Sequence, residues 1–503
     1  MFTDELRCNV WNEIRQQDIR AFSKQLTPAT FAKAAYRAGV KLGKSPLGLA
    51  NLVWPGIAAA FHGGMSFACV LTTTLKLLED QKQSAARLDK ARKQGKRRRS
   101  KGKRSKHDPR RDDPMKVSEA AFATARQRMP MSFWFELLVL LGQQFEEQHP
   151  SLHGFRDFRI LAMDGTRIDL PESRQLCNHF GTAKNAFGQQ QPQARMVMLQ
   201  FPFTRMPYRY ELAPVSCGEI TLATRLCTHL RRRDLVLLDA GFWSYGLLWA
   251  IQNQKAFFAL RLKKDVKLTT VKQLGKSEQL VRWTPKDSRG KWRKAGLPKS
   301  IDLRVIKYHV PGFQPQAIVT NVLSQRAISY QDWTRLSTSC QDAHRKLSVG
   351  LFHRRWEIET SYHEMKVDQG MEGQLRSRVP ESIAYEIAGH VVLYLLLRWL
   401  MVEAAVKHGL DPLRLSYLEA FRELESMRAA LLTSDPQWVR DVLLPRLLDR
   451  IAEHRVPERP GRHYPRRKKS KQDNSNKNSH KKSTKRKASA AKPKPRKKFA
   501  KQG

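Results

Sequence analysis

Two carboxylates stand at positions where metal-assisted chemistry is possible. Asp164 follows the apolar run of LAMDGT, Asp239 follows that of LLDAGF, and each precedes a glycine by one or two residues. An acid at the tip of a buried strand points into the crevice where α/β sheets hold ligands, and the glycine permits close approach. Mg²⁺ takes one or two such carboxylates together with phosphate oxygens and water. The alternative for each acid alone is a turn former or helix cap.

A third acid lies in the stretch FHRRWEIETSYHEMK, residues 352–366. At about 100° per residue, one helical face carries Glu359 with two rings and two cations, namely Phe352, Tyr362, Arg355 and Lys366. We expect Glu359 to be a third metal-ligating carboxylate, with Arg355 and Lys366 binding phosphates beside it. Glu357 and Glu364 fall off this face and are predicted to face solvent. The alternative is a helix surface of i,i+4 charge pairs.

Hydrophobic patterning predicts the elements that must position these acids. Residues 156–262 give the order β-β-β-α-β-α-β, which indicates an α/β sheet with an antiparallel pair at one side. Residues 263–342 are short alternating stretches typical of a β-rich insertion. Long helical patterns then resume over 343–371, 381–403 and 412–428.

The predicted organisation has six parts. They are a helical N-terminal region 1–155 with a basic linker at 92–111, a catalytic core in two pieces at 156–262 and 343–405, the insertion 263–342, a helical region 406–455 and a basic tail 456–503. Helices with basic flanks are compatible with helix-turn-helix DNA binding, and a plain helical bundle is the alternative.

The charge balance points to a polyanionic partner. The formal net charge is +46 over 503 residues, which favours nucleic acid first and an anionic membrane surface second. Residues 92–111 carry a net +11 and residues 461–503 a net +17, so the remainder is basic too. Both segments are poor in hydrophobic residues and are predicted to be disordered. We interpret the tail as a DNA-contacting segment; a solubilising extension is the alternative.

Cysteine usage and hydropathy bear on location. The six cysteines are far apart and form no CxxC pair, which argues against a structural zinc site and a disulfide scaffold. The N-terminus has no signal-peptide pattern. The most apolar stretch, 390–402, is shorter than a bilayer span, contains Arg398 and is predicted to be a buried core helix. These features predict a cytoplasmic protein with no membrane partner.

Together the three acids and their contexts resemble the DDE transposases of bacterial insertion sequences, in the insertion-sequence-four group. That group carries the motif Y-x₂-R-x₃-E-x₆-K, where x is any residue. This chain has the same spacing in Phe352, Arg355, Glu359 and Lys366. Its first aspartate lies in a D-G-T/S context, as Asp164 does, and its second in D-R-G-F/Y, as Asp239 does here in D-A-G-F. The resemblance covers roughly residues 115–405 and implies an RNase H-like core interrupted by a β-strand insertion.

Two positions depart from the family pattern. Phe352 replaces the tyrosine, which removes a hydroxyl and keeps the ring, and Ala240 replaces the arginine, which removes one expected phosphate contact. Neither position is a metal ligand in the family, so we expect activity.

The resemblance implies cut-and-paste transposition. The enzyme would cut DNA at transposon ends and join the freed 3′-hydroxyl to target DNA, with Asp164, Asp239 and Glu359 holding two Mg²⁺ ions, for which Mn²⁺ can substitute. The implied partners are terminal inverted repeats, target DNA and a second copy of the chain, at the bacterial nucleoid. Phe352, Arg355, Tyr362 and Lys366 would contact DNA.

Relatives in this group stack a flipped base on a tryptophan of the insertion. Trp283 and Trp292 are the candidates here, because an aromatic ring is a platform for an unpaired base. The alternative for each ring is packing within the insertion.

Two rival functions fit parts of the sequence. One is a metal-dependent nuclease or resolvase with the same fold, which a strand-transfer assay would separate from a transposase. The other is a transposase-derived DNA-binding protein without activity, which the loss of an acid would favour; all three acids are present.

Overall fold

One mixed sheet organises the part of the chain that the structure describes. This computed structural model describes residues 22, 24–42, 49–61, 119–184, 188–263, 265–287, 290–309, 315–334 and 350–457. The basic linker 92–111, residues 343–349 and the tail from residue 458 on lie outside these ranges, so the predictions made for them stay predictions. All described elements from α2 to α17 belong to one compact unit.

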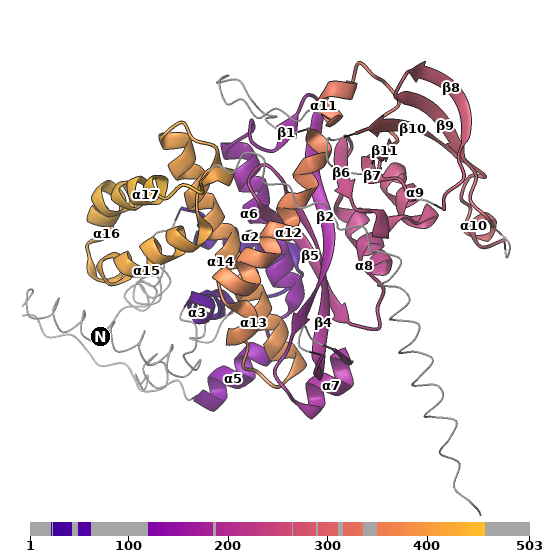
Figure 1. Cartoon of the computed structure of the whole chain (residues 1–503). Helices are drawn as coiled ribbons and strands as arrows, with labels where there is room; N and C mark the ends of the chain where they lie inside the picture. Colours follow the sequence, from indigo (N-terminus) through magenta and orange to yellow (C-terminus); the bar gives the residue numbers. More distant parts are fainter. Residues whose placement is uncertain are drawn as a thin grey trace, which may run out of the picture. The chain divides into compact units, whose positions relative to one another are not determined.

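The sheet has the strand order β3-β4-β2-β6-β7-β11-β10-β9-β8, with β5 pairing β4 and β1 pairing β2 (Figure 1). The strands are β1 (Gly154–Phe155), β2 (Phe158–Asp169), β3 (Thr182–Lys184), β4 (Gln190–Phe201), β5 (Met206–Pro214), β6 (Asp234–Leu238), β7 (Phe257–Arg261), β8 (Thr269–Gly275), β9 (Glu278–Trp283), β10 (Ile301–Tyr308) and β11 (Gln316–Thr320). β2, β6 and β7 are parallel neighbours, and the other pairings are antiparallel.

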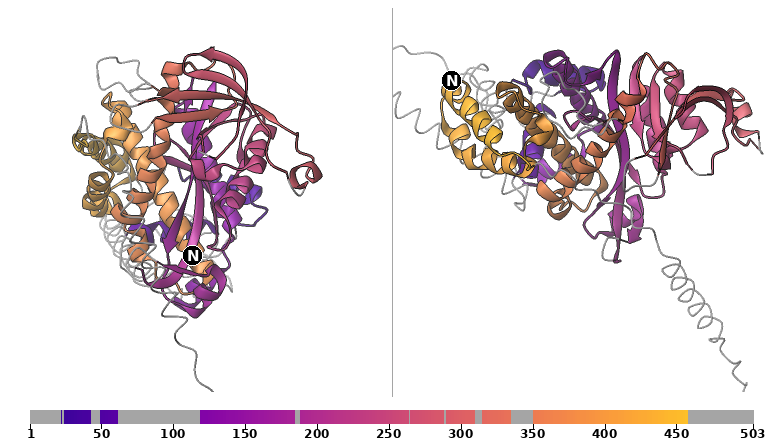
Figure 2. Two further views of the ribbon diagram at one scale, coloured as in Figure 1. Left: turned by 45° about the vertical axis from the view of Figure 1, so that its right-hand side comes forward. Right: turned by 45° about the horizontal axis from the view of Figure 1, so that its top comes forward.

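The central strands are apolar because helices cover both faces of the sheet. Every residue of β6 is buried, as expected for a parallel strand covered on both sides. Figures 1 and 2 show α12 (Glu357–His363) and α14 (Pro380–Lys407) on one side and α8 (Glu219–Leu226) and α9 (Tyr245–Asn253) on the other. The predicted order β-β-β-α-β-α-β corresponds to β2, β4, β5, α8, β6, α9 and β7, but the prediction missed α7 (Arg174–Phe180) and β3, which lie between β2 and β4 in the chain.

The insertion is built from strands, as predicted, but it continues the main sheet. β11 pairs antiparallel with β7, and β10, β9 and β8 follow outward in turn. A sequence pattern identifies such strands, whereas their joining to the core sheet depends on the free edge of β7, some 55 residues away in the chain.

Helices surround the sheet before and after this region. On the N-terminal side and within the sheet region they are α2 (Pro28–Arg37), α3 (Leu49–Phe61), α5 (Glu119–Gln127), α6 (Met131–Gln148), α7 (Arg174–Phe180), η3 (Cys227–His229), η4 (Ala240–Phe242), α10 (Lys291–Lys294) and α11 (Tyr330–Thr334). Those that follow are η5 (Leu351–Trp356), η6 (Glu364–Asp368), α13 (Met371–Gln374), η7 (Pro412–Arg414), α15 (Tyr417–Thr433), α16 (Pro436–Trp438), η8 (Val439–Leu443) and α17 (Leu444–Glu453).

Helix α14 is the core helix of the described chain. By length and composition alone, this 28-residue helix could span a membrane. However, 94% of its most apolar stretch is buried inside the protein. The prediction of a buried core helix is confirmed, while its predicted bounds of 381–403 and 390–402 were too short. Gly389 lets α3 approach closely, because a Cβ there would lie 2.3 Å from the carbonyl oxygen of Gly56.

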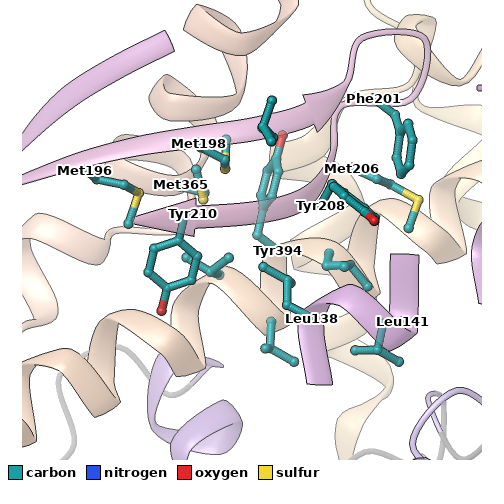
Figure 3. Packing of buried hydrophobic residues seen from close by; sticks show 14 of the residues in the cluster. Leu138, Leu141, Met196, Met198, Phe201, Met206, Tyr208, Tyr210, Met365 and Tyr394 are labelled. Atoms are coloured by element: carbon teal, nitrogen blue, oxygen red, sulfur yellow. The ribbon is translucent and has the colours of Figure 1, made fainter. Parts of the chain in front are cut away.

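Buried side chains pack between the antiparallel strands and the helices. Figure 3 shows Met196 and Tyr210 of β4 and β5 together with Leu138 of α6 and Tyr394 of α14. All four side chains are at most 1% exposed. This core fixes the sheet against α14, and therefore against the segment that immediately precedes α14 in the chain.

The segment 351–368 is not one regular helix. It begins as a 3₁₀ turn in η5, becomes α-helical in α12 and widens to a π-helix in η6. π-helical turns are rare and are frequent at functional sites. The uniform 100° spacing used for the sequence prediction therefore holds only near Glu359.

Candidate active site

The two strand acids lie side by side because of the β2–β6 register. In this parallel pair Arg159 stands opposite Asp234 and Ala162 opposite Leu237. Continuing by two residues places Asp164 opposite Asp239, with backbones about 5 Å apart. The guanidinium of Arg159 holds Asp234 through two hydrogen bonds of 2.7 and 2.6 Å and so helps to set this register.

Each acid is oriented by a backbone N–H of the residues that follow it. The N–H of Gly165 donates to Asp164 Oδ1 at 2.8 Å, and that of Gly241 donates to Asp239 Oδ1 at 2.8 Å. A Cβ at position 241 would lie 2.9 Å from Asp239 Oδ1, so the glycine makes room for the folded-back carboxylate. Asp239 thus caps η4, as the alternative interpretation predicted. A cap bond uses one oxygen and leaves the other for a ligand.

The pKa of Asp164 depends on the other two acids. Burial, which is the largest cause, and the negative charges of Asp239 and Glu359 together raise its pKa to about 7, against the lowering effects of the Gly165 N–H and of Arg355. A buried carboxyl next to like charges resists ionisation. The charges of the three predicted acids therefore act on one another, and a bound cation would reduce the repulsion between them.

Glu359 is held by the arginine one turn before it. Arg355 Nη1 donates to Glu359 Oε1 at 3.0 Å, and the Arg355 guanidinium lies 4.5 Å from the ring centre of Trp356. Arg355 is 8% exposed and Glu359 is 43% exposed. The third acid is consequently open to solvent on a helix whose cation is buried.

The donors present suit a hard divalent cation. Asp164 and Asp239 offer carboxylate oxygens from neighbouring strands, which are the ligands that Mg²⁺ prefers. Within the described ranges, no three His, Cys, Asp or Glu side chains are grouped closely enough to hold a metal ion. Glu359 is bound to Arg355 instead. The structure therefore contains a pair of acids with a third acid beside them.

The other residues of the predicted helical face attach that helix to β2. The Tyr362 hydroxyl donates to the backbone carbonyl of Asp164 at 2.8 Å. The Lys366 ammonium donates to the backbone carbonyl of Arg167 and forms an ion pair with Glu372 at 2.9 Å. Phe352 and Tyr362 are each 6% exposed. DNA contact by these residues stays a prediction, and for the two rings it requires them to be uncovered.

The two candidate tryptophans differ in environment. Trp283 is 7% exposed and lies between Trp243 and Tyr245, with ring centres 5.0 and 5.3 Å away. Trp292, in α10, is half-buried, and a Cβ at position 246 would lie 2.9 Å from its ring. Trp283 therefore packs in the interior, and Trp292 is the ring that retains open surface.

Comparisons with known proteins identify the family of this region. Residues 156–396, which include all three acids, match the family model described as transposase DDE domain. The chain is also 27% identical over 375 residues to the transposase InsG for insertion sequence element IS4 of Escherichia coli (strain K12), covering 70% of this chain and 80% of that protein. Residues 156–396 thus belong to the transposase DDE domain family. The sequence resemblance is thereby confirmed.

A solved structure is also similar to this transposase, the piggyBac transposase synaptic complex with hairpin DNA. The match has a TM-score of 0.32 and 10% identity, and it covers 69% of this chain and 66% of that chain. A TM-score this low does not by itself establish a shared fold.

Two acids that were predicted to face solvent are instead paired with arginines, and of these Glu364 is buried and Glu357 is half-buried. Glu364 is 5% exposed, and its carboxylate accepts from Arg205 Nη1 at 2.7 Å, from the Tyr394 hydroxyl at 2.6 Å and from Arg398. Glu357 accepts from Arg205 Nε at 2.8 Å. The prediction was wrong because the counter-charges come from a hairpin and from α14, distant in the sequence.

This ion cluster is the part of the site that sequence reasoning missed. Arg205 binds both Glu357 and Glu364, which flank Glu359 along the same segment. Burial alone would raise the pKa of Glu364, but Arg398 and Arg205 outweigh it and hold the pKa below its usual value. One signal was available: Arg398 interrupts an otherwise apolar core helix, and a buried arginine needs an acid.

Proposed function

We propose that this transposase cuts DNA at the ends of a mobile element and joins the freed 3′-hydroxyl to target DNA. The observation that carries the proposal is that Asp164 and Asp239 follow the paired residues of the neighbouring parallel strands β2 and β6, and that the charges of Asp239 and Glu359 both raise the pKa of Asp164. An RNase H-like core is part of the proposal. It is supported by the strand order β5-β4-β2-β6-β7, in which three antiparallel strands adjoin two parallel ones.

The residues divide the work as follows. Asp164, Asp239 and Glu359 would hold two Mg²⁺ ions, which supply activation of the attacking oxygen and stabilisation of the leaving oxygen. In cleavage, a water oxygen bonds to the scissile phosphorus as the P–O3′ bond breaks, and the strand keeps a 3′-hydroxyl. In transfer, the oxygen of that hydroxyl bonds to a target phosphorus as the target's own P–O3′ bond breaks, and the target strand is left with a 3′-hydroxyl. Arg355 lies beside Glu359 and is placed to bind a phosphate oxygen there.

Charge-removing substitutions test the three acids. Asp164→Asn, Asp239→Asn and Glu359→Gln should each lower Mg²⁺-dependent cleavage of duplexes taken from the DNA flanking the gene by about 10³-fold or more, since the ions are no longer held. Binding to the same duplexes should change little. The matched controls are Asp265→Asn and Glu381→Gln at exposed positions. Full Mg²⁺-dependent cleavage by any of the three variants would defeat the assignment.

Strand transfer separates a transposase from a nuclease. A pre-cut end with a free 3′-hydroxyl should be joined to plasmid DNA by the parent protein with Mg²⁺ or Mn²⁺, and not in EDTA. Cleavage without joining would favour the nuclease. Because two ends must be joined, we propose that a homodimer assembles on the DNA at the bacterial nucleoid, which light scattering of the DNA complex can test.

Trp292 is the proposed platform for an unpaired base, because Trp283 is buried and contacts the rings of Trp243 and Tyr245. Stacking of this kind is worth about 1–3 kcal/mol per base. The Trp292→Ala variant should therefore bind an end duplex with one unpaired base less tightly, while Trp283→Ala should mainly lower stability.

A further inference from the structure

A basic groove lies at the end of the sheet opposite the acids. It encloses about 930 Å³ between the segments that precede β6 and β7, the start of β10 and the residues after β11. This volume is near the upper end of the range for ligand pockets, roughly 300–1,000 Å³. From Arg233, before β6, to Asp239 is six residues of extended chain, or about 20 Å. The groove is therefore separate from the candidate active site.

The charge of the groove is strongly positive. Its lining includes four cations and a single acid, which are Arg232, Arg233, Lys255, Arg282 and Asp302. Arg282 is neutralised by Asp302 at 2.7 Å, and Arg233 pairs with Asp157 at 3.0 Å. Neither Arg232 nor Lys255 makes an ion pair within the described part of the chain. Two exposed cations thus have their charge available for an anion.

Two of the four cations, Arg233 and Lys255, have an unfavourable backbone conformation. Arg233 and Lys255 each stand two residues before a paired position of β6 and β7, and their φ angles are 70° and 57°. The N–H of Arg233 donates to the carbonyl of Lys255 at 3.1 Å. Glycine adopts such angles freely, whereas a residue with a Cβ is disfavoured in this conformation. Strain of this kind concentrates at ligand sites.

Apolar surface accompanies the charge. Trp249 of α9, beside β7 in Figure 1, lines the groove half-buried, and Leu323 lines it with 41% of its surface exposed. A small inorganic anion needs the cations only. A nucleic-acid strand uses both features, because its phosphates bind Arg and Lys while its sugars and bases pack on aromatic and apolar side chains.

We propose that this groove is a second DNA-binding site, which takes the phosphodiester backbone of DNA away from the phosphate being cut. The proposal rests on the proposed function in one respect only, namely that the ligand of the chain is DNA. Arg232 and Lys255 bind the phosphates, and Trp249 and Leu323 contact the sugar or an adjacent base. Because the groove lies about 20 Å from the acids along β6, the DNA it holds is either the continuation of the same duplex or a second duplex.

The first test is the salt dependence of DNA binding. The full chain and an Arg232→Glu/Lys255→Glu variant are titrated with a random-sequence duplex in EDTA, and fluorescence anisotropy gives the affinity at several salt concentrations. Each lost phosphate contact lowers the slope of log K against log salt by about 0.9. We expect the slope to fall by about 2, with at least a tenfold loss of affinity at low salt.

The control has the same change of charge at another surface. Arg440→Glu/Arg446→Glu reverses two exposed cations near the C-terminal end of the described chain. We expect this control to change the slope by less than 1, and thermal melting to be the same for both variants and the parent. An equal loss in the control, or no loss in the groove variant, would overturn the proposal.

Crosslinking locates the contact and separates this inference from the proposed function. A benzophenone amino acid is placed at Trp249 in the groove or at Trp356, which is 49% exposed beside Arg355. We expect both positions to crosslink to duplex DNA, and the Arg232→Glu/Lys255→Glu background to abolish crosslinking only at position 249. Crosslinking at 356 without any at 249 would overturn the second site and leave the proposed function standing. Failure at both positions, together with absent cleavage, would defeat both.

Two sets of DNA substrates distinguish whether the groove binds the same duplex as the acids or a second duplex. If the groove holds the same duplex, its crosslink at position 249 appears with a single long end duplex and is lost when that duplex is shortened. If it holds a second duplex, the crosslink persists with the short duplex and requires added plasmid. Either result supports the site. A crosslink at position 249 that forms with an acidic peptide and never with DNA would overturn it.

Discussion

At the scale of single residues, Asp164 combines a structural cost with a chemical role. Its carboxyl is buried beside two other acids, so its pKa is about 7 in the folded chain against 3.8 ordinarily. Between these values the folded protein keeps a proton that the unfolded protein has lost. The free energy of unfolding must therefore decrease as the pH rises from about 4 to about 7.

This relation predicts that Asp164→Asn stabilises the metal-free protein. In EDTA at pH 8 the variant should have the higher urea midpoint, by an amount that corresponds to about 2–4 kcal/mol, because asparagine does not ionise. Below about pH 4 the two midpoints should coincide. A parent protein that is more stable than the variant at pH 8 would contradict the burial of this carboxyl next to like charges.

At the scale of elements, the ion cluster holds the segment that carries Glu359. Arg205 of the β4–β5 turn and Arg398 of α14 meet on Glu364 at the start of η6, while the Tyr362 hydroxyl ties α12 to β2. Glu359 lies three residues before Tyr362 and five residues before Glu364. Its position relative to the strand acids thus depends on buried charges rather than on helix propensity.

Removal of the central charge tests this attachment. Glu364→Gln leaves the buried Arg398 without its acid and Arg205 with Glu357 alone, and it should lower the free energy of unfolding by about 3–5 kcal/mol at pH 7. The pKa of Glu364 is lowered in the fold, so its contribution is present above its usual pKa of about 4.5 and decreases at lower pH. The control is Glu425→Gln, at an exposed position of α15.

A double-substitution cycle shows whether the effect comes from the pair. Glu364→Gln combined with Arg398→Met should cost less than the sum of the single substitutions, because each single change leaves an unpaired buried group. The measurement is urea unfolding of all four proteins. Simple additivity would mean that the two groups do not interact in solution.

At the scale of the whole molecule, the charge is the dominant property. With a net +46, the affinity for random DNA should decrease steeply with salt. Deleting residues 461–503 removes a net +17 and leaves the described chain, which ends at residue 457, intact. We expect the deletion to reduce the slope of log K against log salt by several units and to preserve cleavage of an end duplex. Loss of cleavage in the truncated protein, with the fold retained, would place the tail within the catalytic machinery.

The sequence by itself determined the elements and the chemically important residues. Asp164 and Asp239 were recognisable because apolar runs end at them, and Glu359 because its spacing to Arg355 and Lys366 matches a known family. The β-rich character of 263–342 followed from alternation. These features are local: side-chain periodicity reports whether a segment is a strand or a helix.

Only the tertiary structure decided which residues meet. The register of β2 against β6 places the two acids together, Arg205 and Arg398 bury Glu364, Tyr245 and Trp243 cover Trp283, and β11 attaches the insertion to β7. Each of these contacts joins residues far apart in the chain. A periodic pattern carries no information about the distant partner, because that partner is selected by packing and charge compensation in the folded molecule.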